Sequence, residues 1–296
     1  MKCKKCKENA VISSPHLCRK HFIEYFEKKV HDCINKYGLI GRFDSICVAS
    51  SGGKDSTAAL YLMKKFFPES KVTALVIDEG IKGYRDKTLI DLKRFCAKNK
   101  INLNIISFKK EFGKTLDEII KSKKLKIKPC NICGTMRRYL LNKYSRGYGC
   151  IVTGHNLDDE AQAIIMNLFR NQIDVLARLG PKTGISAQKN FTQRVKPLYF
   201  CSEKESAIYA LLMGFDVSFN ECPYVVESYR ADLRDLLNDY ESRHKGTKLN
   251  IVSSFLKMLP KLKARYANSS PITCKVCGEP SSKDVCNACT LVEKIR

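Results

Sequence analysis

The sequence predicts an α/β protein with a doubly wound, mainly parallel sheet and a small cysteine-rich module at each end. Three observations lead to this prediction. Apolar strand-like runs alternate with amphipathic helix-like runs through the middle of the chain, short polar motifs follow the strands, and paired cysteines gather near both termini. Such alternation is typical of a parallel sheet with helices on both faces and ligands beyond the carboxyl ends of its strands.

The elements follow one another at regular spacing. Strand-like runs occupy residues 42–50, 71–80, 101–108 and 149–156, and helix-like runs occupy residues 54–67, 86–100 and 157–171. A polar motif closes three of the strands: SSGGKDS at 50–56, DEG at 78–80 and GHNLDDE at 154–160. Because the carboxyl ends of parallel strands share one edge of the sheet, we expect these motifs to line one cleft.

Composition and charge narrow the class of protein. With 296 residues, 44% of them hydrophobic, the chain can bury a sizeable core. Its apolar runs are far shorter than the about 18 residues that span a bilayer, and its start lacks the apolar core of a signal peptide, so we expect a cytoplasmic protein without a membrane partner. The formal net charge of +23 indicates a polyanionic partner, first of all nucleic acid. The alternative is a lysine-rich proteome in which every surface carries this charge.

Fifteen cysteines in a cytoplasmic chain indicate metal binding or redox chemistry rather than structural disulfides. Two groups of four have the spacing of zinc ligands: Cys3, Cys6, Cys18 and His21 near the N-terminus, and Cys274, Cys277, Cys286 and Cys289 near the C-terminus. Each Cys-x-x-Cys turn can present two sulfurs to one ion, and a second turn completes the tetrahedron. We therefore expect two structural zinc ions. A redox pair or an iron site is the alternative for either group.

These groups also suggest how the chain is divided. We expect an N-terminal zinc finger over residues 1–30, a catalytic domain with a linker helix over 31–240, and a helical segment with a zinc ribbon over 241–296. The ends are the more basic parts, since residues 1–40 hold 9 basic and 4 acidic side chains and residues 241–296 hold 11 and 4.

A third cysteine pair, Cys130 and Cys133, has no partner pair nearby in the sequence. Cys222 precedes a proline at the expected end of a strand, which makes it a loop thiol able to reach a site. Three thiolates leave a tetrahedral metal with one open position, or leave one iron of a cubane cluster without a protein ligand. The remaining cysteines are expected to be small core residues: Cys33, Cys47, Cys96, Cys150 and Cys201.

The motif SSGGKDS indicates a phosphate-binding loop. Gly52 and Gly53 allow a sharp turn that brings backbone amides against an anion, and the helix that follows adds its positive end. Lys54 supplies a point charge, and Ser51 and Ser56 offer hydroxyls. Neither a Walker loop nor a dinucleotide-binding loop is present, because both require different glycine spacing.

The loop resembles the pyrophosphate loop, Ser-Gly-Gly-x-Asp-Ser, of enzymes that split ATP between its α and β phosphates and activate a carbonyl oxygen as its adenylate. Together with GHNLDDEAQ, a Cys-x-x-Cys followed by paired arginines, a distant Cys-Pro and a zinc knuckle at each end, it resembles the tRNA two-thiouridine synthetases of the TtuA group over residues 3–289. The resemblance implies the adenine-nucleotide α-hydrolase-like fold and ATP-dependent thiolation of a uridine in tRNA.

The same resemblance implies the site residues. ATP would be bound by Ser51, Gly52, Gly53, Lys54, Asp55, Ser56, Asp78, Gly154 and Asp159. Cys130, Cys133 and Cys222 would hold a 4Fe-4S cluster whose fourth iron is free to carry sulfide. The implied catalytic residues are Lys54, Asp55, Arg137 and Asp158 or Asp159; Arg138 is the alternative to Arg137.

The resemblance also implies a reaction and its partners. ATP would adenylate the uridine oxygen, Mg²⁺ and Lys54 would neutralise the departing pyrophosphate, and sulfide would displace AMP. Asp158 or Asp159 would bind the magnesium or move a proton, although acids at a helix start are also simple caps. His155 is either a phosphate contact or a satisfied turn residue. The expected partners are tRNA, a sulfur donor that is a ubiquitin-like thiocarboxylate carrier or free sulfide, and a second copy of the chain.

Three alternatives stay open at this point. A lysidine synthetase or an amidotransferase with the same loop would deliver nitrogen and would not need the three cysteines. Thiolation by a persulfide, with a transient disulfide between Cys130 and Cys222, would not need a cluster. A zinc-ribbon RNA-binding protein would have a vestigial ATP loop. The motifs do not distinguish whether the modified base is the anticodon wobble uridine or the T-loop uridine.

Overall fold

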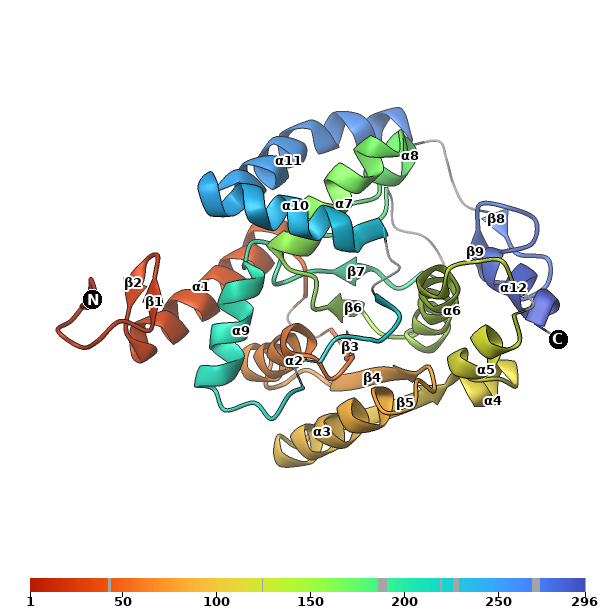
Figure 1. The fold of residues 1–296 in the computed structure, drawn as a ribbon, viewed down its shortest axis with the longest axis horizontal. Helices are drawn as coiled ribbons and strands as arrows, with labels where there is room; N and C mark the ends of the chain where they lie inside the picture. The colour runs from red at the N-terminus through yellow and green to blue at the C-terminus, as the bar shows by residue number, and fades with distance from the viewer. Residues whose placement is uncertain are drawn as a thin grey trace.

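The centre of the fold is a parallel five-stranded sheet in the order β5-β4-β3-β6-β7 (Figure 1). The computed structural model describes residues 1–41, 44–123, 125–185, 191–218, 220–225, 229–267 and 272–295. The strands are β3 (Ile46–Ala49), β4 (Val72–Asp78), β5 (Asn102–Ser107), β6 (Cys150–Thr153) and β7 (Arg194–Val195). Because β3 lies between β4 and β6, the strand order reverses there, and a doubly wound sheet binds ligands at this point. The predicted fold class is confirmed.

Alternate residues of the strands face two separate cores. Ile46 and Val48 of β3 belong to the larger core, whereas Cys47 between them faces a smaller core on the other side of the sheet. The larger core is covered by α1 (Arg19–Tyr37), α2 (Lys54–Phe66), α3 (Arg85–Lys98), α7 (Leu157–Phe169), α9 (Glu203–Leu212) and α11 (Thr247–Arg265). The opposite face carries α4 (Phe108–Phe112), α5 (Leu116–Lys121) and α6 (Pro129–Tyr144). The short α8 (Ile173–Leu176) and the longer α10 (Tyr229–Arg243) pack against α7.

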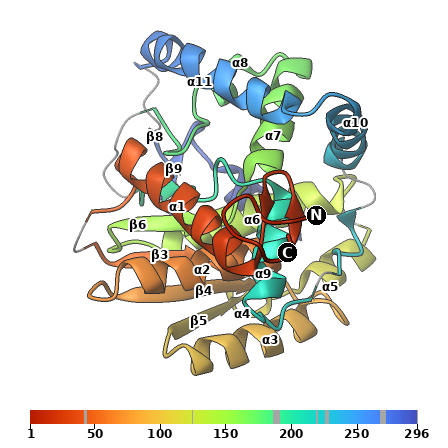
Figure 2. The same cartoon turned by 90° about the vertical axis from the view of Figure 1, so that its left-hand side faces the viewer.

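The two cysteine-rich modules lie at opposite ends of the long axis of the molecule (Figure 1). The N-terminal module is a hairpin of β1 (Ile12–Ser13) and β2 (His16–Leu17) that leads into α1, and Figure 2 shows α1 and α9 in front of α2 when viewed from this end. The C-terminal module pairs β8 (Ile272–Thr273) with β9 (Pro280–Ser281) and ends in α12 (Asn287–Ile295), which packs against α6. The boundaries expected at residues 30 and 240 fall inside α1 and α10.

The four predicted strands correspond to β3, β4, β5 and β6, although residues 42–43 of the first lie outside the described residues. The strand expected before Cys222 was wrong, because the described residues 215–218 and 220–222 form no strand. Phe215 packs instead against Tyr61, Phe95 and Tyr209, so this segment runs over helices, where no neighbouring strand is present to pair with it. Among the described residues, no helix combines the length and apolar character needed to cross a bilayer.

Candidate active site

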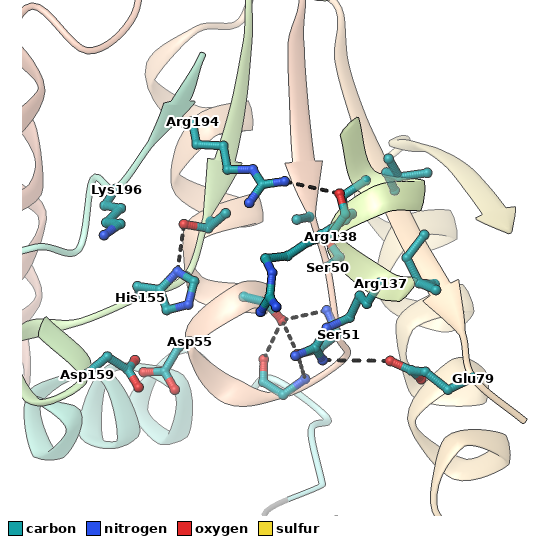
Figure 3. A pocket seen from close by; sticks show the side chains of 18 of the residues that line it. Ser50, Ser51, Asp55, Glu79, Arg137, Arg138, His155, Asp159, Arg194 and Lys196 are labelled. Atoms are coloured by element: carbon teal, nitrogen blue, oxygen red, sulfur yellow. Dashed lines mark hydrogen bonds and ion pairs between the residues drawn. The ribbon is translucent and has the colours of Figure 1, made fainter. Parts of the chain in front are cut away.

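A cavity of about 470 Å³ opens at the carboxyl ends of β3, β4 and β6 (Figure 3). Residues from all three predicted motifs line it, as expected of motifs that share one edge of the sheet. These are Ser50, Ser51, Gly53, Asp55, Ser56, Glu79, Gly154, His155 and Asp159. Basic side chains form much of the remaining lining: Arg85, Arg137, Arg138, Arg194, Lys196 and Arg230. The cavity therefore combines a phosphate-binding loop with an unusually cationic wall.

The loop between β3 and α2 is shaped by close backbone contacts. Gly52 has a φ of +82°, and a Cβ atom there would lie 2.6 Å from the backbone oxygen of Thr88 on α3. A Cβ atom at Gly154 would lie 2.7 Å from the backbone nitrogen of Ser56. No side chain caps α2 at Gly53, so the first N–H groups of this helix remain available to an anion in the cavity. Gly154 thus brings the loop after β6 directly onto the start of α2, and Gly52 brings the phosphate loop against α3.

Lys54 lies beside the cavity rather than in its lining. Its Nζ is 3.0 Å from Asp55 Oδ2 and 2.9 Å from Glu203 Oε1 at the start of α9. Burial alone would lower the pKa of Lys54, but the two carboxylates raise it above its ordinary value, so the ammonium stays charged. These carboxylates engage two of the three N–H donors of Lys54, so the ammonium can also donate to a phosphate.

The two neighbouring acids at the start of α7 have different environments. Asp159 lines the cavity and also caps the helix, since its carboxylate accepts the N–H of Asn156 while the Asn156 side chain accepts the N–H of Asp159. Burial and the charges of Asp55 and Glu160 outweigh nearby Arg230 and raise the pKa of Asp159 to about 6. Asp158 is buried away from the lining, paired with Lys248 and accepting the N–H of Glu203. The geometry favours Asp159 over Asp158 for chemistry.

The DEG motif contributes its glutamate rather than its aspartate to the cavity. Asp78, which we expected to bind ATP, does not line the cavity; its carboxylate accepts the N–H of Gly80 and so fixes the turn. Glu79 lines the cavity with only 1% of its side chain exposed, and it is paired with Arg85 and Arg137. The sequence placed the DEG motif in the cleft but singled out Asp78 rather than Glu79, and it missed Arg85. The position of Glu79 between Asp78 at the strand end and Gly80 was the feature that could have identified it. The sequence spacing did not predict that Arg85 would be its partner.

The cationic wall draws on elements far apart in the sequence. Arg137 and Arg138 come from α6, Arg194 from β7 and Arg230 from α10, and of these only the α6 pair was anticipated. Burial and then the charges of Arg138 and Arg137 lower the pKa of Arg194 to about 10. The Arg194 side chain donates to the backbone oxygen of Arg138 over 3.2 Å. Such close like charges favour an anionic ligand in this cavity.

His155 lies between these cations and the acids in Figure 3. Burial, together with the charges of Lys196 and the surrounding arginines, lowers the pKa of His155 well below its ordinary value. The imidazole is therefore neutral at pH 7, and its Nδ1 lies 2.9 Å from Thr153 Oγ1. One ring nitrogen thus has a partner, as expected of a satisfied turn residue, while the ring also lines the cavity, as expected of a phosphate contact.

The structure brings the three candidate cluster cysteines together. Cys130 and Cys133 lie in the first turn of α6, and the Cys130 thiol donates to the backbone oxygen of Tyr224, two residues beyond Cys222. Cys133 and Cys222 border the same apolar cluster, and Cys222 is close enough to both other thiols for their charges to interact. All three are half-buried, and burial raises the pKa of Cys133 to about 12 although the charge of nearby Arg137 opposes this shift.

These thiols differ from the two zinc-like groups in their spacing. In the described part of the chain, the ligand atoms of Cys3, Cys6, Cys18 and His21, and those of Cys274, Cys277, Cys286 and Cys289, lie within 4.8 Å of one another. His21 presents Nδ1 at 3.3–3.4 Å from the sulfurs of Cys18 and Cys3. Among the described residues, the thiols of Cys130, Cys133 and Cys222 do not form a group as compact as these two. The five cysteines expected in the core are all buried.

Comparisons with known proteins show the family of the chain. The PP-loop domain family matches residues 23–234. The chain is 37% identical to the tRNA-5-methyluridine(54) 2-sulfurtransferase of Pyrococcus horikoshii, with 98% of this chain and 93% of that protein covered. It is 32% identical to the tRNA 2-thiolation protein NcsA of Haloferax volcanii, with 100% and 99% covered. The solved structure of the U34-tRNA thiolase NcsA from Methanococcus maripaludis, with its 4Fe-4S cluster, is 30% identical, has a TM-score of 0.84 and covers 99% of this chain and 96% of that one.

Proposed function

The chain belongs to the PP-loop family of ATP-dependent tRNA 2-thiolation sulfurtransferases. We propose that it adenylates O2 of a uridine in tRNA and then replaces that oxygen with sulfur. The site of sulfur transfer would be formed by Cys130, Cys133 and Cys222. The observation that carries the proposal is one continuous arrangement: a phosphate loop, a cationic cavity and a three-thiol group that meet at Arg137. A nitrogen-transferring enzyme would have no use for the thiols, and the relatives named above are sulfurtransferases.

The loop residues would hold the nucleotide. The free N–H groups at the start of α2 and the hydroxyls of Ser51 and Ser56 would bind the phosphates, and the apolar floor of Leu75 and Ile77 suits a base. Lys54 and the arginines of the wall would stabilise the negative charge that develops on the departing pyrophosphate. Asp159, with Asp55 beside it, would hold Mg²⁺ against the phosphates. Closure of this cationic wall around the nucleotide would exclude water from the adenylated uridine.

Three metal groups would complete the protein. The two outer groups of ligands fit structural zinc, since each offers four ligands of the right type around one centre. The thiol trio fits a 4Fe-4S cluster, which would supply an iron without a protein ligand at which sulfur is carried. The trio lies next to Arg137, a cation suited to hold an anionic sulfur near the cavity.

We further propose that the partners are tRNA and a donor of sulfur. We also propose that the protein works in the cytoplasm. This location is part of the name of a relative that is 35% identical, the cytoplasmic tRNA 2-thiolation protein 1 of Aspergillus niger. The relatives above act on different uridines, 54 in one name and 34 in another. We expect thiolated nucleoside at one of these two positions, and mass spectrometry of tRNA from a deletion strain would identify the position.

The decisive test replaces Cys222 by serine in anaerobically purified protein supplied with ATP, sulfide and tRNA. Cys222→Ser should abolish 2-thiouridine formation and lower iron content, while both zinc ions and the circular dichroism spectrum stay unchanged. Cys96→Ser is the matched control, because this buried thiol lies on α3 and a helical serine can bond to its own helix. The control should keep its activity.

Two outcomes would contradict parts of this proposal. Full activity of Cys222→Ser would remove this residue from the trio. A wild-type protein that thiolates tRNA without iron, and that forms a Cys130–Cys222 disulfide during turnover, would replace the cluster by persulfide chemistry.

A further inference from the structure

A chain of buried charges links the phosphate loop to the cysteine-bearing helix α6. Arg85 Nη1 donates to the backbone oxygen of Ser51 over 2.6 Å, and Arg85 Nε lies 2.6 Å from Glu79 Oε2. The other carboxylate oxygen, Glu79 Oε1, lies 3.7 Å from Arg137 Nη1 (Figure 3). The carboxylate of Glu79 is thus shared between two guanidinium groups on different elements.

The loop end of this chain is rigidly attached. Arg85 begins α3 with 3% of its side chain exposed, and its Nη1 also bonds Thr88 Oγ1 at 3.1 Å. The loop rests on the same turn of α3, because Gly52 leaves no room for a Cβ atom beside Thr88. A shift of the loop when phosphates bind would therefore either move Arg85 or break its bond to Ser51.

The other end of the chain has freedom to respond. Arg137 is 46% exposed to the cavity, and its contact with Glu79 is the longer of the two ion pairs. It lies four residues after Cys133 on α6, a spacing that places both side chains on one face of the helix. The charges of Arg137 and Cys133 interact, and so do those of Glu79 and Cys133. The single carboxylate of Glu79 neutralises only one of the two positive charges of Arg85 and Arg137. Arg137 can therefore still attract an incoming anion.

We propose that Glu79 is a positioning residue that couples the phosphate loop to the thiol trio, by holding Arg137 in a position that depends on whether nucleotide occupies the loop. The inference rests on the proposed function for the meaning of the two sites, but the coupling itself needs neither sulfur transfer nor tRNA. In this arrangement the position of Arg85 depends on the phosphate loop, and Glu79 links the position of Arg85 to that of Arg137. A displacement of Arg137 then changes the surroundings of Cys133.

The test measures how fast iodoacetamide alkylates Cys133 and Cys222 in the cluster-free full chain, with and without Mg²⁺ and α,β-methylene-ATP, with mass spectrometry as the readout. In the wild type we expect nucleotide to change the alkylation rate by about threefold or more, the range of ordinary coupling between sites. In Glu79→Gln this ratio should fall close to one. The variant should fold, since a glutamine oxygen can still accept from Arg85 and the bonds of Arg85 to Ser51 and Thr88 remain.

The matched control is Glu111→Gln. Glu111 also pairs with α6, and in the described part of the chain its carboxylate bonds to Lys143 and Tyr144 and not to the phosphate loop. This control should keep the wild-type ratio, and Glu79→Asp should restore part of it. If Glu79→Gln does not fold, Arg137→Gln interrupts the chain at its half-exposed end, and the same loss of the ratio is expected.

Two results would overturn the inference: a wild-type ratio of one, or a Glu79→Gln ratio equal to that of the wild type. Each is distinct from failure of the proposed function. A normal alkylation ratio in a protein that does not thiolate tRNA would remove the function and keep the coupling. Normal thiolation by Glu79→Gln, together with a ratio equal to that of the wild type, would remove the coupling and keep the function.

Discussion

Asp159 shows how one side chain can both cap a helix and face a reaction site. Its carboxylate completes the reciprocal cap of α7 with Asn156, and the same group borders the cavity beside Asp55 (Figure 3). Burial raises the pKa of Asp159 to about 6, so the group changes charge close to neutral pH rather than in acid. An acid in this state is poised to gain a cation, because a bound Mg²⁺ would favour the charged form that burial disfavours.

This pKa predicts a pH dependence of nucleotide binding. Below pH 6 a proton occupies Asp159 in the free protein and competes with Mg²⁺, so affinity for Mg²⁺–ATP should weaken by up to about tenfold for each pH unit below 6. Above pH 6 the affinity should level off. Titration calorimetry at several pH values would measure this, with Asp159→Asn compared in the same buffers because both proteins share the titration of ATP itself.

The expected result for Asp159→Asn is weaker binding whose remaining pH dependence is that of the nucleotide alone. Asp158→Asn is the control. It should lower the melting temperature, because buried Lys248 loses its ion pair, and it should keep the wild-type pH dependence of nucleotide binding. An unchanged pH dependence in Asp159→Asn would assign the titration to another group.

At the scale of elements, α6 connects three parts of the molecule. Its first turn carries Cys130 and Cys133, and its middle carries the arginines of the cavity wall. Its C-terminal end holds the C-terminal module, because Asn142 in the last turn and Arg146, two residues beyond the helix, both donate to buried Glu279. The ribbon is therefore docked on the helix that presents the thiols.

This docking predicts that Glu279→Ala loosens the ribbon without removing its metal. Loss of hydrogen bonds to a charged group should cost about 1.5–3 kcal/mol and leave Asn142 and Arg146 unpaired. Hydrogen exchange of α12 and the β8–β9 hairpin should accelerate, thiolation should decrease, and zinc content should stay at two. Asp284→Ala is the control, because Asp284 pairs with Lys275 at the exposed surface of the same module and should have little effect. Equal exchange in both variants would show that Glu279 does not hold the ribbon.

The elements that could be predicted from sequence are those whose signals are local. The strands β3, β4 and β6 are short, mainly apolar runs, and in β5 apolar residues are interspersed with polar ones. The zinc-like groups have ligands within 19 or 16 residues of one another, so their spacing alone identified them. The two-residue β7 left no such signal, yet it places Arg194 in the cavity. The pairing of Glu79 with Arg137 depends on how α6 packs on the sheet. Likewise, the periodicity of α7 could not decide which of Asp158 and Asp159 faces inward.

At the scale of the whole molecule, the two cysteine-rich modules extend the surface at opposite ends of the long axis, and both ends of the chain are strongly basic (Figure 1). In the N-terminal module Lys4, Lys5 and Lys7 are all exposed. Phosphate contacts release counterions, so basic groups that grip tRNA set how steeply binding falls with salt. A cavity alone would be reached by one nucleotide, whereas contacts at the ends would hold the folded RNA by its backbone.

We predict that changing Lys4, Lys5 and Lys7 together to glutamine weakens tRNA binding and reduces the slope of log Kd against log salt by about one to three, as expected for one to three lost phosphate contacts. The control changes Lys93, Lys98 and Lys100, which are equally exposed but lie near the amino-terminal edge of the sheet, opposite the cavity. Filter binding across a salt series would measure both variants. Equal losses would mean that tRNA responds to total charge and that the module does not grip it. A loss confined to the first variant, with unchanged ATP affinity, would assign the N-terminal module to RNA binding and leave the cavity to the reacting nucleotide.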